Sequence, residues 1–137
     1  MDKVRLGMIG SQFAAHLHLN SLPALRRSKV DVVAVASKNK EHAQSFAKKF
    51  NVPDYYDDYH RVLERKDVHV VDVCAATHLH HTMAIDAANA GKHIICEKPL
   101  TGFFGDGRTV SRQVMMEEAL KNASSVLKAV QTNRVKF

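Results

Sequence analysis

Short apolar runs rich in β-branched residues alternate along this chain with segments whose apolar residues recur at helical spacing. Residues 30–36 read Val-Asp-Val-Val-Ala-Val-Ala, whereas Ala43, Phe46, Ala47 and Phe50 fall on one face of a helix. This alternation predicts an α/β fold, with a doubly wound, mostly parallel sheet and helices on both faces. The expected strands are residues 4–9, 30–36, 55–56, 70–75 and 93–96, and a sixth begins at residues 134–137.

The expected helices carry start and stop signals in the sequence. Pro23 ends or distorts a helix over residues 12–25, because proline cannot continue a helical hydrogen-bond ladder. Thr77 can cap the helix that ends at Gly91. Asp57 and Asp58 offer a cap for a short helix before it. A last helix is expected over residues 110–132, with Val110, Val114, Leu120, Ala123, Leu127 and Val130 facing inward.

Composition limits the class of protein. The chain has 137 residues, of which 45% are hydrophobic and 25% charged, as expected for one globular domain, and no apolar run is long enough to cross a membrane. Cys74 and Cys96 fall in strand-like segments and are interpreted as buried free thiols, which favours a cytoplasmic location. The net charge is +6, but the basic residues are scattered, so no nucleic-acid partner is expected.

The turn after the first strand resembles a dinucleotide-binding fingerprint, G-x-G-x-x-G/A. The sequence here is Gly10-Ser11-Gln12-Phe13-Ala14-Ala15. Gly10 suits the tight turn, and Ala15 can replace the third glycine. Gln12 stands in place of the second glycine, although backbone N–H groups at the helix start can still bind phosphate. An ordinary strand–helix turn is the alternative interpretation.

The end of the second strand indicates which dinucleotide is bound. NAD-binding domains commonly carry an acid there that binds the ribose hydroxyl. This chain has Ser37 and Lys38 and no carboxylate. A hydroxyl and an ammonium favour the 2′-phosphate of NADP, with NAD as the other candidate. The alternative is that Lys38 is a solvated loop residue.

A Glu-Lys-Pro tripeptide follows the fifth strand directly. Ligands of open α/β sheets bind just beyond the carboxyl ends of the strands, which is where Glu97 and Lys98 would lie. Pro99 restricts the backbone of the residue before it. Taken alone, the tripeptide would equally suit a lysine in a solvated loop.

Three histidines crowd the start of the fourth expected helix. His78, His80 and His81 do not converge on one point at this spacing, and no carboxylate accompanies them, so no metal site is expected. A helix start beside a cofactor is the preferred interpretation. His42, His60 and His69 are expected at the surface.

The sequence resembles the N-terminal Rossmann domain of the glucose–fructose oxidoreductase / inositol dehydrogenase (Gfo/Idh/MocA) family over essentially its whole length. The last three of its motifs, in their order and spacing, are the most specific. The motifs are Gly7-Met8-Ile9-Gly10, Ala47-Lys48-Lys49-Phe50, Tyr56-Asp57-Asp58-Tyr59, His78-Leu79-His80, Ala90-Gly91-Lys92-His93 and Glu97-Lys98-Pro99-Leu100.

The resemblance implies an oxidoreductase that transfers hydride between NAD or NADP and a sugar, inositol or related polyol. Lys98 resembles the family's catalytic lysine, Glu97 would lie against the nicotinamide half, Pro99 would shape the turn through a cis bond, and His80 matches the family's histidine. The cofactor-binding residues expected are Gly10, Ser11, Gln12, Phe13, Ser37, Lys38, Ala75, Ala76, Thr77, His78, His80, Glu97 and Lys98.

Several departures from the family pattern limit this expectation. Ala75-Ala76-Thr77 stands where members commonly have Thr-Pro-Asn. The family's general base and most substrate contacts belong to a second domain, which is expected to be missing here. The 137 residues are therefore expected to form one cofactor-binding domain, inactive alone, that self-associates or pairs with a second-domain chain. A non-catalytic dinucleotide sensor is the alternative.

Overall fold

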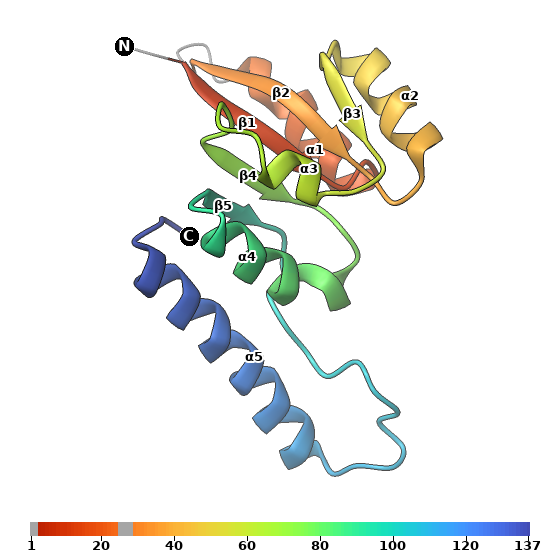
Figure 1. Cartoon of the computed structure of the whole chain (residues 1–137). Helices are drawn as coiled ribbons and strands as arrows, with labels where there is room; N and C mark the ends of the chain where they lie inside the picture. The colour runs from red at the N-terminus through yellow and green to blue at the C-terminus, as the bar shows by residue number, and fades with distance from the viewer. Residues whose placement is uncertain (1–2, 25–28) are drawn as a thin grey trace.

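The computed structural model describes residues 3–24 and 29–137 and contains one five-stranded sheet. All neighbouring strands are parallel, and their order is β3-β2-β1-β4-β5. The predicted doubly wound α/β fold is therefore confirmed, and β4 ends two residues earlier than expected. The strands are β1 (Val4–Ile9), β2 (Val30–Ala36), β3 (Asp54–Tyr56), β4 (Val70–Val73) and β5 (His93–Cys96) (Figure 1).

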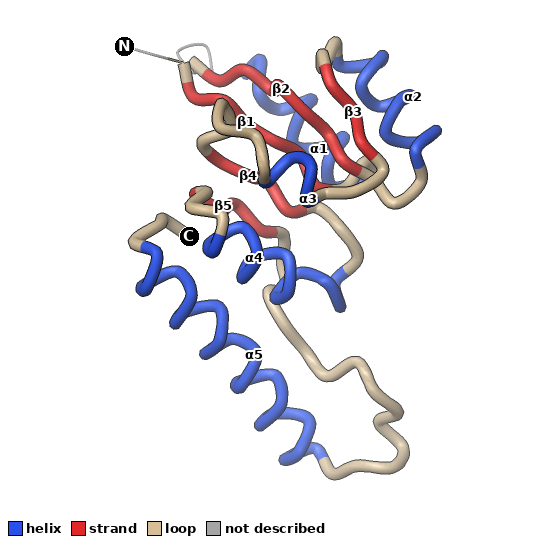
Figure 2. Tube along the Cα trace, viewed as in Figure 1, coloured by secondary structure: helices blue, strands red, loops and turns tan. Residues whose placement is uncertain are grey.

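Helices cover both faces of the sheet, and each face has its own hydrophobic core (Figure 2). On one face Leu6 and Met8 of β1 pack with Phe46, because α1 and α2 lie there. On the other, Ile9 packs with residues of α3 and α4 such as Val62. The helices are α1 (Phe13–Ser21), α2 (Lys40–Phe50), α3 (His60–Leu63), α4 (His80–Asn89) and α5 (Arg112–Asn133), with 3-10 turns η1 (Leu22–Ala24) and η2 (Thr77–Leu79).

Several helix boundaries differ from the expected ones, including those of α5, which covers Arg112–Asn133 where residues 110–132 were expected. α1 ends at Ser21, before Pro23, and the chain tightens into η1; Leu25 lies outside the described residues. Thr77 does not cap α4, because it begins the 3-10 turn η2 instead, and no side chain caps α4 at Leu79. The N-cap residue of α3 is Tyr59, which makes no side-chain cap bond, and not one of the predicted aspartates. Asp58, one residue earlier, accepts a hydrogen bond at Oδ1 from the His60 N–H at 2.9 Å.

The predicted inward face of the last helix is wrong in part. Val126 is the only residue of α5 that is fully buried, whereas Val114, Leu120 and Leu127 are 45%, 58% and 56% exposed. The helix packs along the outer side of α4 and not on the sheet, and its first half extends beyond the domain (Figure 1). Periodicity alone marks one apolar face, but a helix in the outermost layer buries only the strip that meets its neighbour.

The end of the chain lies beside β5. No strand is assigned within residues 134–137, yet the N–H of Ile94 donates to the carbonyl oxygen of Lys136 at 2.9 Å. The predicted sixth strand therefore does not form within these residues. One main-chain hydrogen bond joins the segment to the free edge of β5. Val135 packs against the core on the α4 side, which holds the segment in place.

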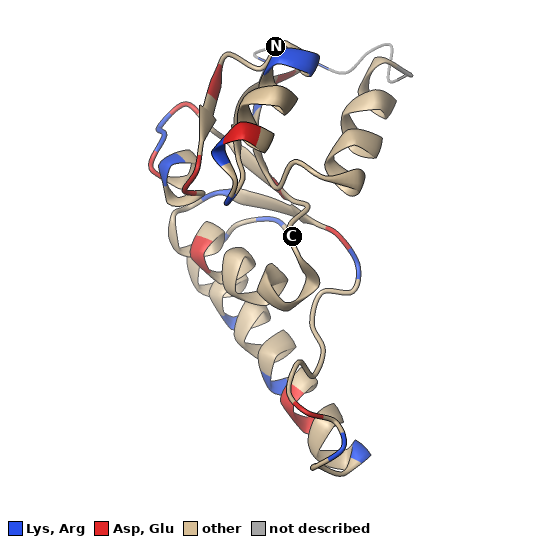
Figure 3. Ribbon diagram, turned by 90° about the vertical axis from the view of Figure 1, so that its right-hand side faces the viewer, with Lys and Arg blue, Asp and Glu red and all other residues tan. Residues whose placement is uncertain are grey.

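Charged residues of both signs occur on several elements of the described chain (Figure 3). Arg65, for example, is bonded to Asp67 and Asp54. None of the described helices is both long and apolar enough to cross a membrane.

Candidate functional site

Main-chain hydrogen bonds continue beyond the carboxyl ends of the strands and tie the site loops together. The N–H of Gly10 donates to Ala36 O at 2.8 Å, and the N–H of Cys74 donates to Ile9 O at 2.7 Å. The N–H groups of Ser37 and Glu97 make equivalent bonds, at 3.0 Å each, to Tyr56 O and Val73 O. The segments after β1, β2, β4 and β5 therefore meet at one edge of the sheet, where ligands of open α/β sheets bind.

The turn after β1 has the geometry of a phosphate-binding loop. Gly10 has a φ of 109°, and a Cβ there would lie 2.5 Å from the carbonyl oxygen of Cys74. The Ser11 hydroxyl is buried and has no hydrogen-bond partner among the described residues. The first N–H groups of α1 have no intrahelical acceptor, and no acid lies in its first turn. An anionic ligand would satisfy these donors.

The side chain of Gln12 is held against α2. Its Nε2 donates to His42 Nδ1 at 3.0 Å, which gives the residue in place of the second fingerprint glycine a partner away from the turn. His42 is exposed, as predicted. Phe13, at the start of α1, is 82% exposed.

A cavity of about 270 Å³ opens at the end of β2. Ser37 and Lys38 line it, as expected for the residues that would meet the adenosine ribose. Asp57 and Asp58 line it too, which the sequence interpretation missed because it treated both only as helix caps. Its remaining walls are apolar or neutral and come from the ends of β1 and β2, the residue before α3, η2 and α4: Ile9, Ala36, Tyr59, Leu79, Thr82 and Met83.

His80 joins the loop after β4 to the turn after β5. It is 2% exposed; its Nδ1 lies 2.9 Å from Pro99 O, and its Nε2 lies 2.9 Å from Ala75 O. The bond between Lys98 and Pro99 is cis, as the resemblance implied. The remaining predicted residues of the loop, Ala76, Thr77 and His78, precede His80 at the same edge, and His78 packs edge-on against Phe104.

A cluster of His18, Asp72 and Glu97 orients the turn that carries Lys98, and the sequence analysis did not predict it. His18 of α1 lies between two carboxylates, with Nδ1 2.8 Å from Asp72 and Nε2 2.9 Å from Glu97. Burial lowers the pKa of His18, but the hydrogen bonds and charges of Asp72 and Glu97 outweigh it and raise the pKa above 6.5. The Lys98 side chain is exposed at the site edge.

Both cysteines are free thiols, as predicted, but only Cys74 is fully buried. Burial, followed by the charge of Asp72, raises the pKa of Cys74 well above its usual range. The same causes raise the pKa of Cys96 to about 11. Neither thiol is therefore a reactive thiolate near neutral pH.

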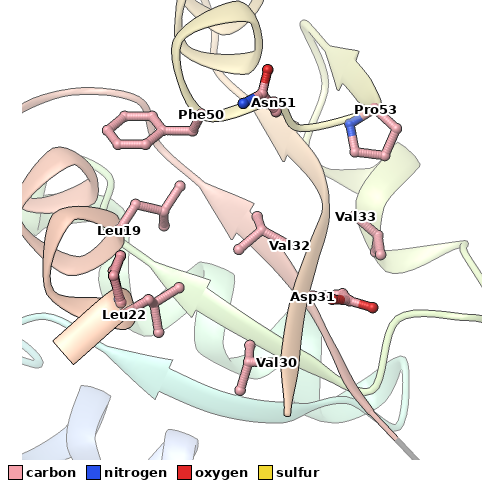
Figure 4. A pocket seen from close by; sticks show the side chains of 10 residues that line it. Leu19, Leu22, Val30, Asp31, Val32, Val33, Phe50, Asn51 and Pro53 are labelled. Carbon is pink, nitrogen blue, oxygen red and sulfur yellow. The ribbon is translucent and has the colours of Figure 1, made fainter. Parts of the chain in front are cut away.

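A larger hollow of about 730 Å³ lies away from this edge, between α1, α2 and β2 (Figure 4). Leu19, Val32 and Phe50 form apolar walls, and Asp31 is the only titratable residue among its described lining residues. It brings together none of the residues predicted from the sequence.

A parallel sheet of this order, with a glycine turn after β1 and site loops at one edge, defines a dinucleotide-binding Rossmann domain. The sequence matches the Gfo/Idh/MocA oxidoreductase family, NAD-binding Rossmann fold, over residues 4–128. The chain belongs to this family and forms its NAD(P)-binding domain.

Several curated relatives are named dehydrogenases, two of them of levoglucosan and inositol. Levoglucosan dehydrogenase of Pseudarthrobacter phenanthrenivorans is 35% identical over 136 residues, which cover 92% of this chain and 32% of the relative. Inositol 2-dehydrogenase of Salmonella typhimurium is 41% identical over 98 residues, which cover 71% of this chain and 27% of the relative. The chain thus spans about a third or less of the length of these relatives.

Solved structures of the same fold carry either dinucleotide. Levoglucosan dehydrogenase in complex with NADH superimposes with a TM-score of 0.78 at 27% identity, covering 98% of this chain and 33% of that one. A 3-ketoreductase from Actinomadura kijaniata in complex with TDP-benzene and NADP gives a TM-score of 0.77 at 26% identity, covering 98% of this chain and 36% of that one.

Proposed function

We propose that this chain is the cofactor-binding part of an NAD(P)-dependent dehydrogenase that acts on a CH–OH group of a sugar, inositol or related polyol. The observation that carries the proposal is the position of Lys98, which follows β5 at the edge where the Gly10 turn and residues 75–80 also meet. The named relatives act on levoglucosan and inositol, which supports this substrate class.

The residues at the edge fit a dinucleotide. The unpartnered Ser11 hydroxyl and the free N–H groups of α1 would bind the pyrophosphate, and the glycine at position 10 leaves room for its close approach. The cavity beside Ser37 would take the adenosine ribose. Residues 75–78 would run along the cofactor, and Glu97 would lie against its nicotinamide half.

Lys98 would stabilise charge on the reacting oxygen. The nicotinamide, when bound, accepts or supplies the hydride. As hydride leaves or reaches the substrate carbon, negative charge develops on the adjacent oxygen, and the Lys98 ammonium would lie close enough to stabilise it. We assign the general base, and most substrate contacts, to a second domain outside these 137 residues.

We further propose that NADP(H) is preferred over NAD(H), because Ser37 and Lys38 end β2 without an acid of their own. Calorimetric titration of the chain with both reduced cofactors tests binding and preference together. We expect NADPH to bind about tenfold more tightly at low salt, a difference of about 1.4 kcal/mol. The Ser37→Asp variant is expected to shift the preference toward NADH.

Asp57 provides the control for this experiment, because its carboxylate lines the same cavity. If Asp57 binds the ribose hydroxyls, NADH will bind at least as tightly as NADPH, and Asp57→Asn will weaken NADH. That result would overturn the NADP preference and leave the proposed function standing. Binding of neither cofactor would overturn the proposed function itself.

We also propose that the chain self-associates through an apolar stripe on α5, formed by Met116, Leu120 and Leu127. These side chains are 57%, 58% and 56% exposed, and their spacing places them on one side of the helix. The same stripe on α5 of a second copy would cover it. Light scattering should show a mass above 15.3 kDa that rises with concentration.

The double variant Leu120→Glu, Leu127→Glu is expected to remain a monomer. Ser125→Glu is its matched control, because Ser125 is exposed on another side of the same helix. This variant should associate as the original chain does. A mass fixed at the monomer value for the unaltered chain would contradict self-association.

A further inference from the structure

A half-buried histidine, whose side chain is 26% exposed, connects three separate parts of the fold at the site edge. His18 comes from α1, Asp72 from β4, and Glu97 from the turn after β5. Asp72 is 3% exposed, so its carboxylate requires partners within the protein. It accepts from His18 at Oδ2 and from the Cys74 thiol at Oδ1, over 2.8 and 3.3 Å.

With Asp72 and Glu97 ionised, the geometry favours a protonated His18. Each ring nitrogen lies within 3 Å of a carboxylate oxygen. An ionised carboxylate can only accept, so both nitrogens must donate, which only the imidazolium can do. A neutral ring would leave either Asp72 or Glu97 without its donor. The cationic ring also separates two negative charges that would otherwise repel each other.

The bonds continue from His18 to the backbone of Lys98. One oxygen of Glu97 accepts from His18 Nε2, and the other accepts from the N–H of Lys98 at 3.2 Å. Both oxygens of the carboxylate are therefore used, one toward α1 and one toward the turn. The orientation of Glu97 is fixed from the helix that begins at the phosphate turn.

We propose that His18 is a positioning residue, which as an imidazolium between Asp72 and Glu97 holds the Glu97–Lys98–Pro99 turn in register with α1. The role of this turn rests on the proposed function, but the bonding itself does not. The titratable groups that contact His18 are Asp72 of β4, Cys74 directly after β4, and Glu97 of the turn. Deprotonation of His18 would release one carboxylate and loosen the turn.

Nuclear magnetic resonance of the ¹⁵N-labelled chain tests the bonding directly. We expect both ring nitrogens of His18 to carry a proton at pH 6.5, with a titration midpoint above that of an ordinary histidine. Asp72→Asn should move the midpoint down, because it removes one of the two carboxylates. A His18 ring with a single proton at pH 6.5 would overturn the proposal, as would a metal ion bound by His18, Asp72 and Cys74.

Cofactor affinity tests the positioning role. For the unaltered chain we expect the NADPH affinity to fall as pH rises through the His18 pKa. His18→Gln should weaken NADPH binding about tenfold at pH 6.5 and abolish this dependence on pH. Asn20→Gln, at an exposed position of the same helix, should keep both the affinity and the profile. If His18→Gln lost thermal stability but kept its NADPH affinity, His18 would have a structural role only.

The amide signal of Lys98 separates failure of this inference from failure of the proposed function. It should shift in His18→Gln and not in Asn20→Gln, whether or not the chain binds a dinucleotide. An unshifted Lys98 amide in His18→Gln would overturn the positioning role. A shifted amide in a chain that binds neither cofactor would overturn the proposed function alone.

Discussion

Replacing Gly10 by alanine is expected to cost about 3 kcal/mol or more in unfolding free energy and to weaken NAD(P)H binding about 100-fold. The added Cβ would lie 2.5 Å from Cys74 O and 2.9 Å from the N of Ala75, so the backbone of the neighbouring loop must move. The φ of 109° adds strain, because residues with a Cβ rarely adopt it. Chemical denaturation followed by circular dichroism, together with cofactor titration, measures both effects.

Gly91→Ala is the matched control. Gly91 also has a positive φ, of 71°, but a Cβ there would meet no atom within 4 Å. Its replacement should cost about 1 kcal/mol from the backbone alone and leave cofactor binding unchanged. Equal losses of stability in the two variants would show that close packing against the loop after β4 contributes nothing.

Replacing His80 by alanine is expected to cost about 3 kcal/mol, because the carbonyl oxygens of Ala75 and Pro99 lose a buried partner. The loss should also weaken cofactor binding, since the two loops that His80 joins both lie at the site edge. Thermal melting and calorimetric titration of the same preparation report the two effects separately.

His81→Ala controls for removal of a ring at the neighbouring position. The Nδ1 of His81 has no hydrogen-bond partner among the described residues, and its Nε2 has only an exposed contact of 3.4 Å with the Thr82 hydroxyl, so removal of the ring should change stability by less than about 0.5 kcal/mol. If His80→Ala were as mild as His81→Ala, water would be replacing the His80 ring at both carbonyls, and the two loops would not depend on it.

The strands and the site edge could be predicted from the sequence because their signals are local. Residues 30–36 and 93–96 form the expected strands without change of bounds, since runs of β-branched residues bounded by turns specify them directly. Parallel strands then place their carboxyl ends together. For this reason Gly10, Ser37 and Glu97 could be predicted to share one edge.

The connection from His18 to Glu97 could not be predicted in the same way. His18 lies 54 positions from Asp72 and 79 from Glu97, and nothing in the spacing of these residues indicates that they meet. Their contact depends on how far α1 turns over β4 and β5, which is a property of tertiary packing. The motif containing Glu97 and Lys98 was visible, but the residue that orients it was not.

The outer helix shows a different limit. Its apolar residues occur at helical spacing, and the sequence alone does not show which neighbour covers them. α5 packs on α4 through Val126 and partly buried neighbours such as Ala129, so Leu120 and Leu127 remain exposed.

Asp57 and Asp58 were predicted from the sequence only as helix caps, although both also line the cavity beside Ser37.

Four main-chain hydrogen bonds beyond the strand ends reduce the conformational entropy that the site loops lose when a ligand binds. Fixing the backbone of one mobile residue costs roughly 1–2 kcal/mol, which a flexible loop would subtract from the affinity on capture. Here the amides of Gly10, Ser37, Cys74 and Glu97 are already bonded across the edge. The edge is therefore preorganised, and little conformational entropy remains to be lost when a dinucleotide arrives.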